Sequence, residues 1–473
     1  MDKLLTPLTS RRRKDLTRRA TDPRDRQPVD PTDIRSRQER DRDRILYSAA
    51  LHRLAYITQV TAPELGHTFH NRLTHSLKVA QVGRRNAERL GRLVTRKEIT
   101  GAAAELVRAA SPDSVEASCL AHDLGHPPFG HIAEEALQHA AREHAGISDG
   151  FEGNAQSFRI VTRLAVRSDG HPGLDLTRQT LDGLLKYPWR HWPRDPHRDG
   201  KRERKWGYYL DDTDAFTFAR EPWPEERRRR LPERSFEAEL MDWADDVTYA
   251  VHDVDDFFRA GLVPLDRLGQ SRSPETRNLL RLLTDAEGAD PQSFPSYEPE
   301  RLVDALQKVI ANNTLVGPYT HTVTSRAAMR EFGSKLIGKY LDAFSVENDL
   351  SSRKVRLRID EEAELEVTAL KMLVMVYVVH RPSLAVVQHG QQRLISDLFE
   401  WYFRASSRAD GDHRLFPPGA KERLGNERDT PENRARVVID LVSGLTERAA
   451  VELHRGLCDG SAASALDATA LIG

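Results

Sequence analysis

Apolar residues recur every three or four positions along most of this chain, which is the period of an amphipathic helix. The first such stripe runs over 41–60 and passes through Ile45, Leu46, Ala49, Ala50, Leu54 and Ile57. The same period predicts helices over 72–93, over 115–126 up to the pair Pro127–Pro128, from 131 to about 144, and over 236–260. Gly261 is expected to cap the last of these, because glycine tolerates the left-handed backbone found at helix ends.

Two segments break the helical period. Residues 165–235 hold many Pro, Gly, Trp and Arg residues and are predicted to form a long irregular excursion. Residues 353–360 read RKVRLRID, which could form a short strand. Beyond 266 the sequence again shows several amphipathic helices. The chain is therefore expected to be all-α, a helical core with additional C-terminal helices and at most short strands.

The length of 473 residues exceeds the size at which one hydrophobic core usually stops growing. Three regions are predicted: a basic N-terminal arm over 1–40, a core over 41–265, and a helical region over 266–473 packed on that core. Hydrophobic residues make up 39% and charged residues 30%, which favours a soluble globular protein. Since the sequence shows neither a membrane-length apolar run nor a secretory signal, we expect a cytoplasmic protein with no membrane partner.

Charge and cysteine content narrow the chemistry. The formal net charge of -1 gives no overall attraction to nucleic acid, although the N-terminal arm carries a local surplus of Lys and Arg. That arm is either a mobile or partner-docked segment or a binding site for a polyanion. The two cysteines, Cys119 and Cys458, cannot form a cysteine cage, so any metal must be held by His, Asp and Glu.

The segment CLAHDLGHPPFGH carries the first candidate site. His122 and Asp123 close the helix predicted over 115–126, and His126 follows one turn later on the same face. Imidazole suits first-row divalent metals and carboxylate suits harder ions, so the pair favours Mn, Mg, Fe, Co or Zn. A lone buried histidine is more often a core residue, and a His-Asp pair also occurs by chance. Whether His122 and Asp123 form a metal site therefore depends on the residues in other segments of the chain.

Long segments elsewhere in the chain carry a resemblance. NRLTHSLKVAQVGRR contains His75, DWADDVTYAVHDVDD contains Asp245, and AHDLGHPPFGHIAEEA lies between them. With these segments the chain resembles the HD-domain phosphohydrolase superfamily and, more narrowly, its deoxyguanosinetriphosphate triphosphohydrolase-like family. The resemblance extends to RDRILYSAALHRLAYITQV, FEGNAQSFRI, LLKYPW, KWGYY and VVIDLVSGLTERAA, and it makes 41–265 the expected HD core.

The resemblance implies a metal site made by His75, His122, Asp123 and Asp245, with Mg or Mn as the expected ion and Fe, Co or Zn as alternatives. Two histidines and two carboxylates would leave coordination positions for water and a phosphate oxygen. Asp246 is the alternative to Asp245. We choose Asp245 because the family's pattern places a tyrosine four residues after the ligand, and Tyr249 satisfies that spacing.

The resemblance also implies a catalytic pair beyond the Pro-Pro turn. His131 and Glu134 are three residues apart, hence on one helix face, and are assigned to water activation or α-phosphate chemistry. Histidine exchanges protons near neutral pH, and a carboxylate partner orients it. The alternative is an ordinary surface pair. His126 is expected either to contact a phosphate or to support a neighbouring site residue.

On the substrate side, Gln59 matches a family position near the sugar or base, and Arg72 matches one near the triphosphate. Arg72 precedes His75 by three residues, so its guanidinium can reach phosphate oxygens beside the metal. His67 and His70 lie close in sequence but match no ligand position.

Two further substrate residues lie four apart on the predicted helix over 236–260. The resemblance implies that the Tyr249 ring stacks under the deoxyribose and that Asp253 accepts a hydrogen bond from its 3'-hydroxyl. Lys186 in LLKYPW is a weaker candidate for substrate binding, as are Asn154 and Gln156 in EGNAQ.

The implied activity is metal-dependent hydrolysis of deoxynucleoside triphosphates to deoxynucleoside and triphosphate, by attack of water at the α-phosphorus. The alternatives are an HD phosphohydrolase acting on another nucleotide or on a nucleic acid end, and a nucleotide-sensing or nucleic-acid-binding protein. Family members form tetramers or hexamers and some are activated by deoxynucleotides, so both properties are expected here. The chain lacks the glycine-rich loops that define kinases, dehydrogenases and esterases.

Overall fold

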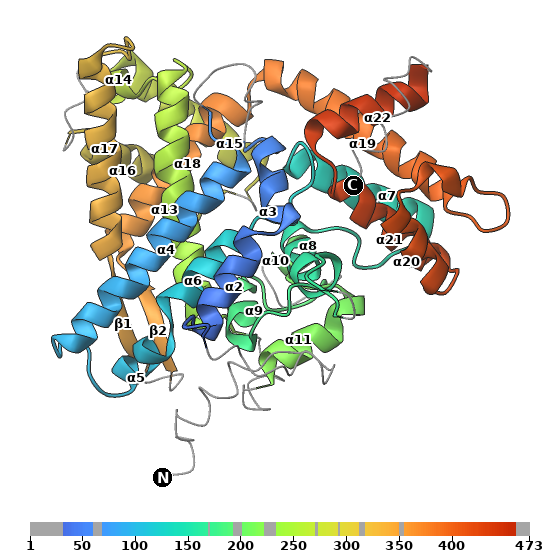
Figure 1. The fold of residues 1–473 in the computed structure, drawn as a ribbon. Helices are drawn as coiled ribbons and strands as arrows, with labels where there is room; N and C mark the ends of the chain where they lie inside the picture. Colours follow the sequence, from blue (N-terminus) through green and yellow to red (C-terminus); the bar gives the residue numbers. More distant parts are fainter. Residues whose placement is uncertain are drawn as a thin grey trace.

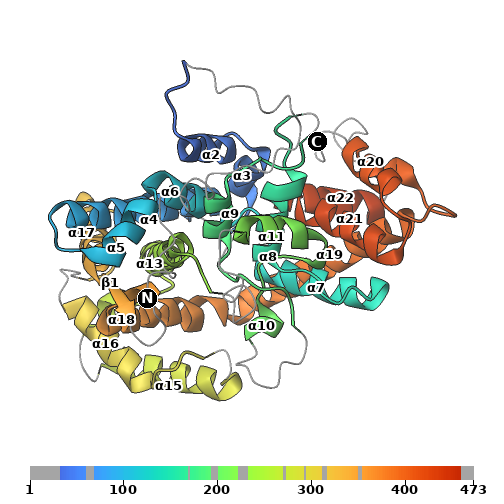
Figure 2. The same cartoon turned by 90° about the horizontal axis from the view of Figure 1, so that it is seen from below.

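Helices dominate the computed structural model of this chain. It describes residues 32–59, 69–168, 171–192, 201–221, 233–269, 273–291, 294–311, 317–349 and 354–459. Within these ranges the strands form one two-stranded sheet, so the all-α expectation is confirmed. Figures 1 and 2 show the helices in two groups lying side by side, a larger one and a smaller one that holds the C-terminal helices.

Three helices form the centre of the larger group and pack against one another: α4 (Arg72–Thr95), α6 (Pro112–Ala121) and α13 (Phe236–Arg259). Side-chain caps fix where each helix begins. Asn71 caps α4 by accepting a hydrogen bond from Thr74 N at 2.9 Å. Ser111 caps α6 and Ser235 caps α13 in the same way. Because of these caps, the register of each helix relative to its neighbours is set at its first turn.

The other elements fall into three sets. Short helices of the first half are α2 (Arg37–Leu46), α3 (Ala49–Arg53), α5 (Gly101–Ala109), α8 (Gly153–Arg159), α9 (Arg178–Leu184), α10 (Lys201–Arg204) and α11 (Thr213–Arg220). The larger group is completed by α14 (Leu265–Leu268), α15 (Pro274–Ala289), α16 (Pro299–Ala311), α17 (Val323–Asp342), β1 (Phe344–Asp349), β2 (Lys354–Ile359) and α18 (Glu361–Val374). The smaller group consists of α7 (His131–Ala145), α19 (Pro382–Ala405), α20 (Pro418–Asn426), α21 (Pro431–Ser443) and α22 (Glu447–Asp459).

Buried apolar residues form two large clusters that correspond to these groups. In the larger cluster, Val79 of α4 and Leu120 of α6 join residues from α13 and from α14 to α18. In the smaller cluster, Leu137 of α7 joins Phe399 of α19 and Val438 of α21. The predicted region 266–473 is therefore shared between the two cores. One helix of the predicted core, α7, belongs to the C-terminal cluster.

The structure corrects two predicted helices. The helix predicted over 41–60 begins at Arg37 and breaks at Ser48, whose hydroxyl accepts from Leu51 N and so starts α3. The helix predicted over 115–126 starts earlier, at Pro112, and ends at Ala121. The His-Asp pair consequently lies in the turn that follows α6 and not on the helix itself.

Other local predictions have mixed outcomes. The excursion over 165–235 is not wholly irregular, because α9, α10 and α11 lie within it. Gly261 follows the end of α13 with φ +69°, which confirms the predicted cap. The strand predicted over 353–360 is β2, and its antiparallel partner β1 was not predicted. The basic arm over 1–40 lies outside the described residues up to position 31.

The two groups meet through a bent pair of helices. After α18 the chain passes through the π-helical turn Met375–Val379 and then changes direction by 82° into α19. Among the described residues no single helix has the length and composition to cross a membrane, although this bent pair passes that test when its two members are taken together.

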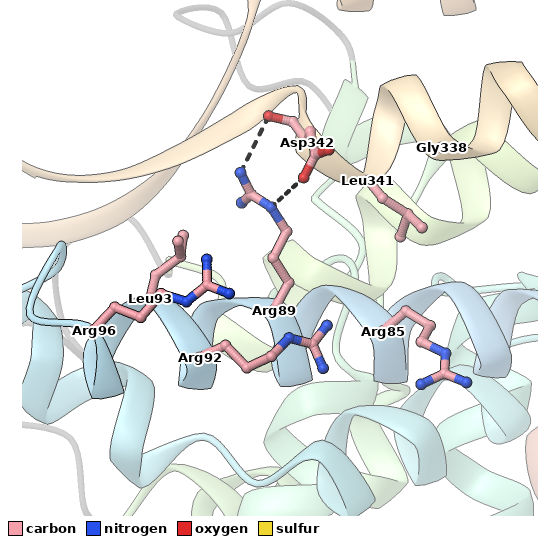
Figure 3. Close-up of a pocket in the computed structure, with 8 residues that line it drawn as sticks. All are labelled: Arg85, Arg89, Arg92, Leu93, Arg96, Gly338, Leu341 and Asp342. Carbon is pink, nitrogen blue, oxygen red and sulfur yellow. Dashed lines mark hydrogen bonds and ion pairs between the residues drawn. The ribbon is translucent and has the colours of Figure 1, made fainter.

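A surface groove of about 420 Å³ lies between α4 and α17. Its lining includes Arg85, Arg89, Arg92 and Arg96, which follow one face of α4, and Asp342 of α17, which forms an ion pair with Arg89 (Figure 3). The predicted site residues of α4 lie in its first turn, whereas these arginines lie in its C-terminal half. The groove is therefore separate from the candidate site.

Candidate metal centre and proton-transfer cluster

The predicted metal ligands come from three elements of the larger group. His75 lies in the first turn of α4, His122 and Asp123 in the turn after α6, and Asp245 in the middle of α13. His75 Nε2 is 3.1 Å from Asp245 Oδ1, and His122 Nε2 is 3.5 Å from the same oxygen and 3.4 Å from Asp123 Oδ1. One ligand atom from each of His75, His122 and Asp245 can be chosen so that all lie within 4.8 Å of one another.

The chemistry of this donor set fits a divalent metal. His122 Nδ1 donates to the carbonyl oxygen of Cys119 at 2.6 Å, which leaves the Nε2 lone pair facing the carboxylates. That buried Nε2 makes no hydrogen bond to any described residue. A buried polar atom without a partner is costly unless something binds it. His75, His122 and Asp245 are thus a group that could hold a metal ion, with imidazole and carboxylate ligands, and Asp123 lies beside them with its Oδ2 bound to Arg72.

The electrostatics of the centre favour positive charge. Burial alone would lower the pKa of His122, but Asp123 and Asp245 outweigh it and raise that pKa to about 9. Burial would raise the pKa of Asp245, but Lys186 and His122 hold it well below its usual range. The centre therefore presents ionised carboxylates in a buried place, which is the condition for binding a cation.

The two adjacent aspartates of α13 have different partners. Asp245 faces the histidines, whereas Asp246 Oδ1 accepts from Lys371 Nζ of α18 at 2.8 Å. The geometry therefore groups Asp245, and not Asp246, with the other predicted ligands. Lys186 lies at the same place, but its ammonium binds Asp245 Oδ2 at 2.7 Å and Asp242 Oδ1 at 2.9 Å. In this structure Lys186 is a partner of a predicted ligand, with its charge already neutralised.

A second cluster lies next to the first. His126 Nδ1 is 3.1 Å from Asp123 Oδ1, and its Nε2 is 3.4 Å from Glu134 Oε1. His131 Nδ1 is 3.2 Å from Glu134 Oε2. His126 and Glu134 are buried, whereas the His131 side chain is 69% exposed. The cluster therefore forms a continuous path of polar groups from the metal centre to the surface at His131.

Lys205, which sequence reasoning missed, completes this cluster. Its Nζ lies 3.3 Å from Glu134 Oε2 and 3.3 Å from Glu152 Oε1. Burial would raise the pKa of Glu134, but Lys205, His131 and His126 hold it well below its usual range. The motif KWGYY contained the signal, since Lys205 directly precedes three buried aromatic residues, Trp206, Tyr208 and Tyr209.

Arg72, Tyr249 and Asp253 lie near the predicted metal ligands. Arg72 is buried, and its Nη1 binds Asp123 Oδ2 at 2.8 Å. Its Nε, Asp253 Oδ2 and Gln59 Oε1 are buried atoms without a hydrogen bond to any described residue. Burial and then Asp253 raise the pKa of Tyr249, whereas Arg72 acts to lower it. Two polar atoms without hydrogen bonds to described residues, Arg72 Nε and Asp253 Oδ2, thus belong to side chains that act on Tyr249.

A tight turn presents the His-Asp pair. Gly125 packs so closely on α8 that a Cβ there would lie 2.2 Å from Gly153 O and from Ser157 N, so only glycine fits. Ser157 Oγ donates to His122 O at 2.8 Å and accepts from Gly125 N at 2.8 Å. The segment EGNAQS therefore supports the turn that carries His122 and Asp123, which gives this part of the quoted motif a structural role.

The C-terminal helices also hold the site. Arg53 donates to Leu124 O and His126 O of the turn at 2.8 and 2.7 Å, and to Ser443 O and Leu445 O at 3.0 Å each. Since its guanidinium binds carbonyl oxygens of both groups at once, Arg53 joins the turn that carries His122 to the end of α21.

Glu447, in the first turn of α22, makes a similar connection. Its Oε1 accepts from Thr58 N at 2.8 Å and from Phe129 N at 3.2 Å, and its Oε2 accepts from Thr58 Oγ1 at 2.7 Å. Thr58 precedes Gln59. Phe129 has a left-handed φ of +68°, which is strained for a residue with a side chain. Glu447 therefore fixes both the Gln59 segment and the turn that leads to His131.

The remaining candidates have structural partners. Gln156 Nε2 donates to Asp440 Oδ1 at 2.9 Å, and Asn154 Nδ2 donates to Glu152 Oε1 at 2.8 Å. His70 binds Asp256 through its Nδ1, away from the predicted ligands. His67 lies outside the described residues.

Comparisons with known proteins agree with this arrangement. A family model described as HD domain matches residues 72–172, and one described as Phosphohydrolase-associated domain matches 357–456. The first match contains His75, His122, Asp123 and the second cluster as far as Glu134, and the second contains Lys371 and Glu447. Fold and site together define a phosphohydrolase of the HD class.

Relatives narrow the class to one family. Proteins named deoxyguanosinetriphosphate triphosphohydrolase-like protein match the chain at 36% identity in Streptomyces coelicolor and at 34% in Corynebacterium efficiens, in each case over 89% of this chain and over 92% and 91% of the relative. A relative of the same name in Bifidobacterium longum is 31% identical over 89% of this chain and 82% of its own length. The chain belongs to the deoxyguanosinetriphosphate triphosphohydrolase-like family, as the sequence resemblance predicted.

Proposed function

We propose that this phosphohydrolase cleaves deoxynucleoside triphosphates into deoxynucleoside and intact triphosphate, by attack of water at the α-phosphorus. The observation that carries the proposal is the closeness of three features: the ligand set His75, His122 and Asp245, the guanidinium of Arg72, and the Asp253 carboxylate. A cation site, an anion-binding arginine and a sugar-binding acceptor are what this substrate requires.

The metal-binding role is assigned to His75, His122, Asp123 and Asp245. A divalent ion held there would supply Lewis-acid chemistry toward a phosphate oxygen and would lower the pKa of a bound water. Mg or Mn is the proposed ion, because two of the four ligands are carboxylates. Lys186 binds Asp245 Oδ2 and so orients Asp245 Oδ1 toward the histidines.

Arg72 is assigned to the triphosphate. Its Nη1 is used by Asp123, and its Nε is a buried donor that still needs an acceptor. A phosphate oxygen would supply that acceptor through a charge-assisted hydrogen bond. Arg72 would thus bind substrate and brace a metal ligand at the same time.

The sugar is assigned to Tyr249, Asp253 and Gln59. Burial, followed by the neighbouring Asp256, raises the pKa of Asp253 well above its usual value. Whether charged or neutral, its Oδ2 remains an acceptor for the 3'-hydroxyl, and the Tyr249 ring lies one turn away on α13. A flat ring under the sugar would exclude a 2'-hydroxyl and so favour deoxyribose.

Proton transfer is assigned to His131 with Glu134. Burial and then Arg72 lower the pKa of His126 to about 3, so this imidazole stays uncharged at neutral pH and serves as a hydrogen-bonding group. The exposed His131 would exchange the proton with solvent, and Glu134, 3.2 Å from its Nδ1, would orient it. Assembly as a tetramer or hexamer and activation by deoxynucleotides stay predictions from the family.

The test is product analysis. Each deoxynucleoside triphosphate and its ribonucleotide counterpart is incubated with the protein and Mg²⁺ or Mn²⁺, and products are separated by anion exchange. We expect deoxynucleoside and tripolyphosphate from the deoxynucleotides and little turnover of ribonucleotides. Release of monophosphate or diphosphate would refute loss of the intact triphosphate, because the bond to the 5'-oxygen would then not be the one broken. Turnover only of another phosphoester would support an HD phosphohydrolase with a different substrate.

A further inference from the structure

The cluster of His126, His131 and Glu134 allows two interpretations. One ligand atom from each lies within 4.8 Å of the others, so these three residues could also hold a metal ion. Alternatively they form a proton-transfer group without a metal. The position of a fourth residue, Lys205, distinguishes the two interpretations.

Lys205 already provides a cation at this cluster. Its Nζ lies 3.3 Å from Glu134 Oε2, the same oxygen that His131 Nδ1 approaches at 3.2 Å. A metal bound to that oxygen would have to share it with an ammonium group, and two cations at such a distance repel strongly in a buried place. The ammonium of Lys205 therefore takes the place of a second metal ion.

The segment around Lys205 is rigidly held. The carbonyl oxygen of Lys205 accepts from Trp189 Nε1 at 2.8 Å, and the next residue, Trp206, is only 1% exposed. Gly207 N donates to Trp189 O at 2.9 Å. A Cβ at Gly207 would lie 2.1 Å from Tyr187 O. The backbone at Lys205 and on its C-terminal side is thus fixed, and its side chain lies at Glu134.

Glu134 is enclosed on its other sides as well. A Cβ at Gly153 would lie 2.6 Å from Glu134 Oε1, so the carboxylate rests on the backbone of α8. Glu152, the cap of α8, is the second partner of the Lys205 ammonium at 3.3 Å. The charged or titratable groups facing Glu134 are therefore Lys205, His131, His126 and Glu152.

We propose that Lys205 is a positioning residue of the proposed reaction: its ammonium holds the Glu134 carboxylate against His131 and keeps this cluster free of a second metal ion. The part of this inference that concerns catalysis rests on the proposed function, whereas the part that concerns metal exclusion does not. The occupancy of the cluster by metal can be measured whatever the substrate is.

The first measurement is metal stoichiometry. The full-length protein is dialysed against Mn²⁺, and bound metal is determined by elemental analysis. We expect a single Mn²⁺ ion per chain in the wild type, lost in His122→Ala, and a second ion in Lys205→Met, because the ammonium no longer occupies the place beside Glu134. Two ions per chain in the wild type, with one lost in His131→Ala, would overturn the proposal.

The second measurement is the pH dependence of turnover, with a deoxynucleoside triphosphate and separately with bis(4-nitrophenyl) phosphate as a general diester. In Lys205→Met the pKa of Glu134 rises because its main cationic partner is gone, so the acid limb of the kcat profile moves to higher pH. We expect kcat at pH 7 to fall about tenfold or more with KM nearly unchanged, since the group lost orients a proton-transfer residue. Lys205→Arg keeps the positive charge and should restore the acid limb.

The matched control is Lys339→Met. Lys339 forms an ion pair with buried Glu366 at 2.7 Å on α17 and α18, outside both clusters. The Lys339→Met variant should have the same kcat and the same pH profile of kcat as the wild type. Equal effects of the two methionine variants, or an increase in KM at constant kcat for Lys205→Met, would overturn a positioning role. If the wild type turns over no deoxynucleotide, the proposed function fails. The metal stoichiometry then still tests the inference that Lys205 excludes a second metal ion.

Discussion

The two helix groups contribute different parts of the site. The predicted metal ligands project from α4, the turn after α6, and α13, all of the larger core. The predicted proton-transfer residues His131 and Glu134 lie on α7, whose apolar face packs against the C-terminal helices in the smaller core. The proposed metal-binding and proton-transfer roles therefore depend on different hydrophobic cores, and the proposed reaction requires that the two cores keep a fixed relative position.

Buried charges and backbone hydrogen bonds join the two groups. Arg159 of α8 binds Asp440 of α21 through Nε at 2.9 Å and through Nη2 at 3.0 Å. It also lies 3.2 Å from Asp212. Arg53 and Glu447 add the contacts described above. Such polar connections are directional, so they fix orientation in a way that apolar contact alone does not.

The largest predicted effect comes from removing a ligand in the larger core. His122→Ala should lose metal binding and lower kcat/KM by at least about 10³-fold, because both Lewis-acid chemistry and water activation are lost. Equilibrium dialysis with Mn²⁺ and steady-state kinetics measure the two effects. His131→Ala, in the smaller core, should keep the metal and lower kcat by roughly 10²- to 10⁴-fold. If the two variants lose metal equally, the division between the cores is wrong.

Local sequence pattern predicted much of the larger core. The apolar stripes gave α4 and α13 because a long amphipathic helix carries its own signal, and Gly261 marked the end of α13. The break at Ser48 was missed because a serine cap inside a continuous apolar stripe changes the backbone without changing the period. Strand β1 was missed because FSVEND has too few alternating apolar positions to be distinguished from a loop.

The residues of the candidate site also fall into those that the sequence predicted and those that it did not. Residues within long motifs, such as His75 and His122, could be named from the sequence, and the structure brings them together with Asp245. Lys205 and Glu447 also lie within quoted motifs, KWGYY and VVIDLVSGLTERAA, but were given no role, since each acts through a partner distant in sequence. Gln156 shows the converse case: its motif suggested substrate binding, and the structure adds a hydrogen bond from its amide nitrogen to Asp440, while its Oε1 makes no hydrogen bond to a described residue.

A smaller effect is expected from breaking the buried connection between the groups. Asp440→Asn removes the charge that Arg159 and Arg423 share, and leaves a buried guanidinium with Asp212 as its remaining carboxylate partner. Loss of one partner of a buried ion pair typically costs about 3–5 kcal/mol. We expect a decrease of that size in the free energy of unfolding, measured by urea titration. Asp285→Asn, in an exposed pair with Arg281, should change it by less than about 0.5 kcal/mol.

The smallest predicted effect concerns Glu447, which reaches from the smaller group to both sides of the site. Glu447→Ala removes the acceptor of three hydrogen bonds, so the Gln59 segment and the strained Phe129 turn lose their common anchor. We expect kcat/KM to fall about tenfold, which corresponds to the loss of roughly 1.4 kcal/mol, through both a higher KM and a lower kcat, with Mn²⁺ binding unchanged.

Glu447→Gln retains one carbonyl oxygen at this position and should recover part of that loss. Glu452→Ala, on the same helix and paired with the exposed Arg448, is the matched control and should behave as the wild type. If Glu447→Ala released the metal as well, the smaller group would be holding the metal ligands themselves, and the separation of metal binding from proton transfer would have to be abandoned.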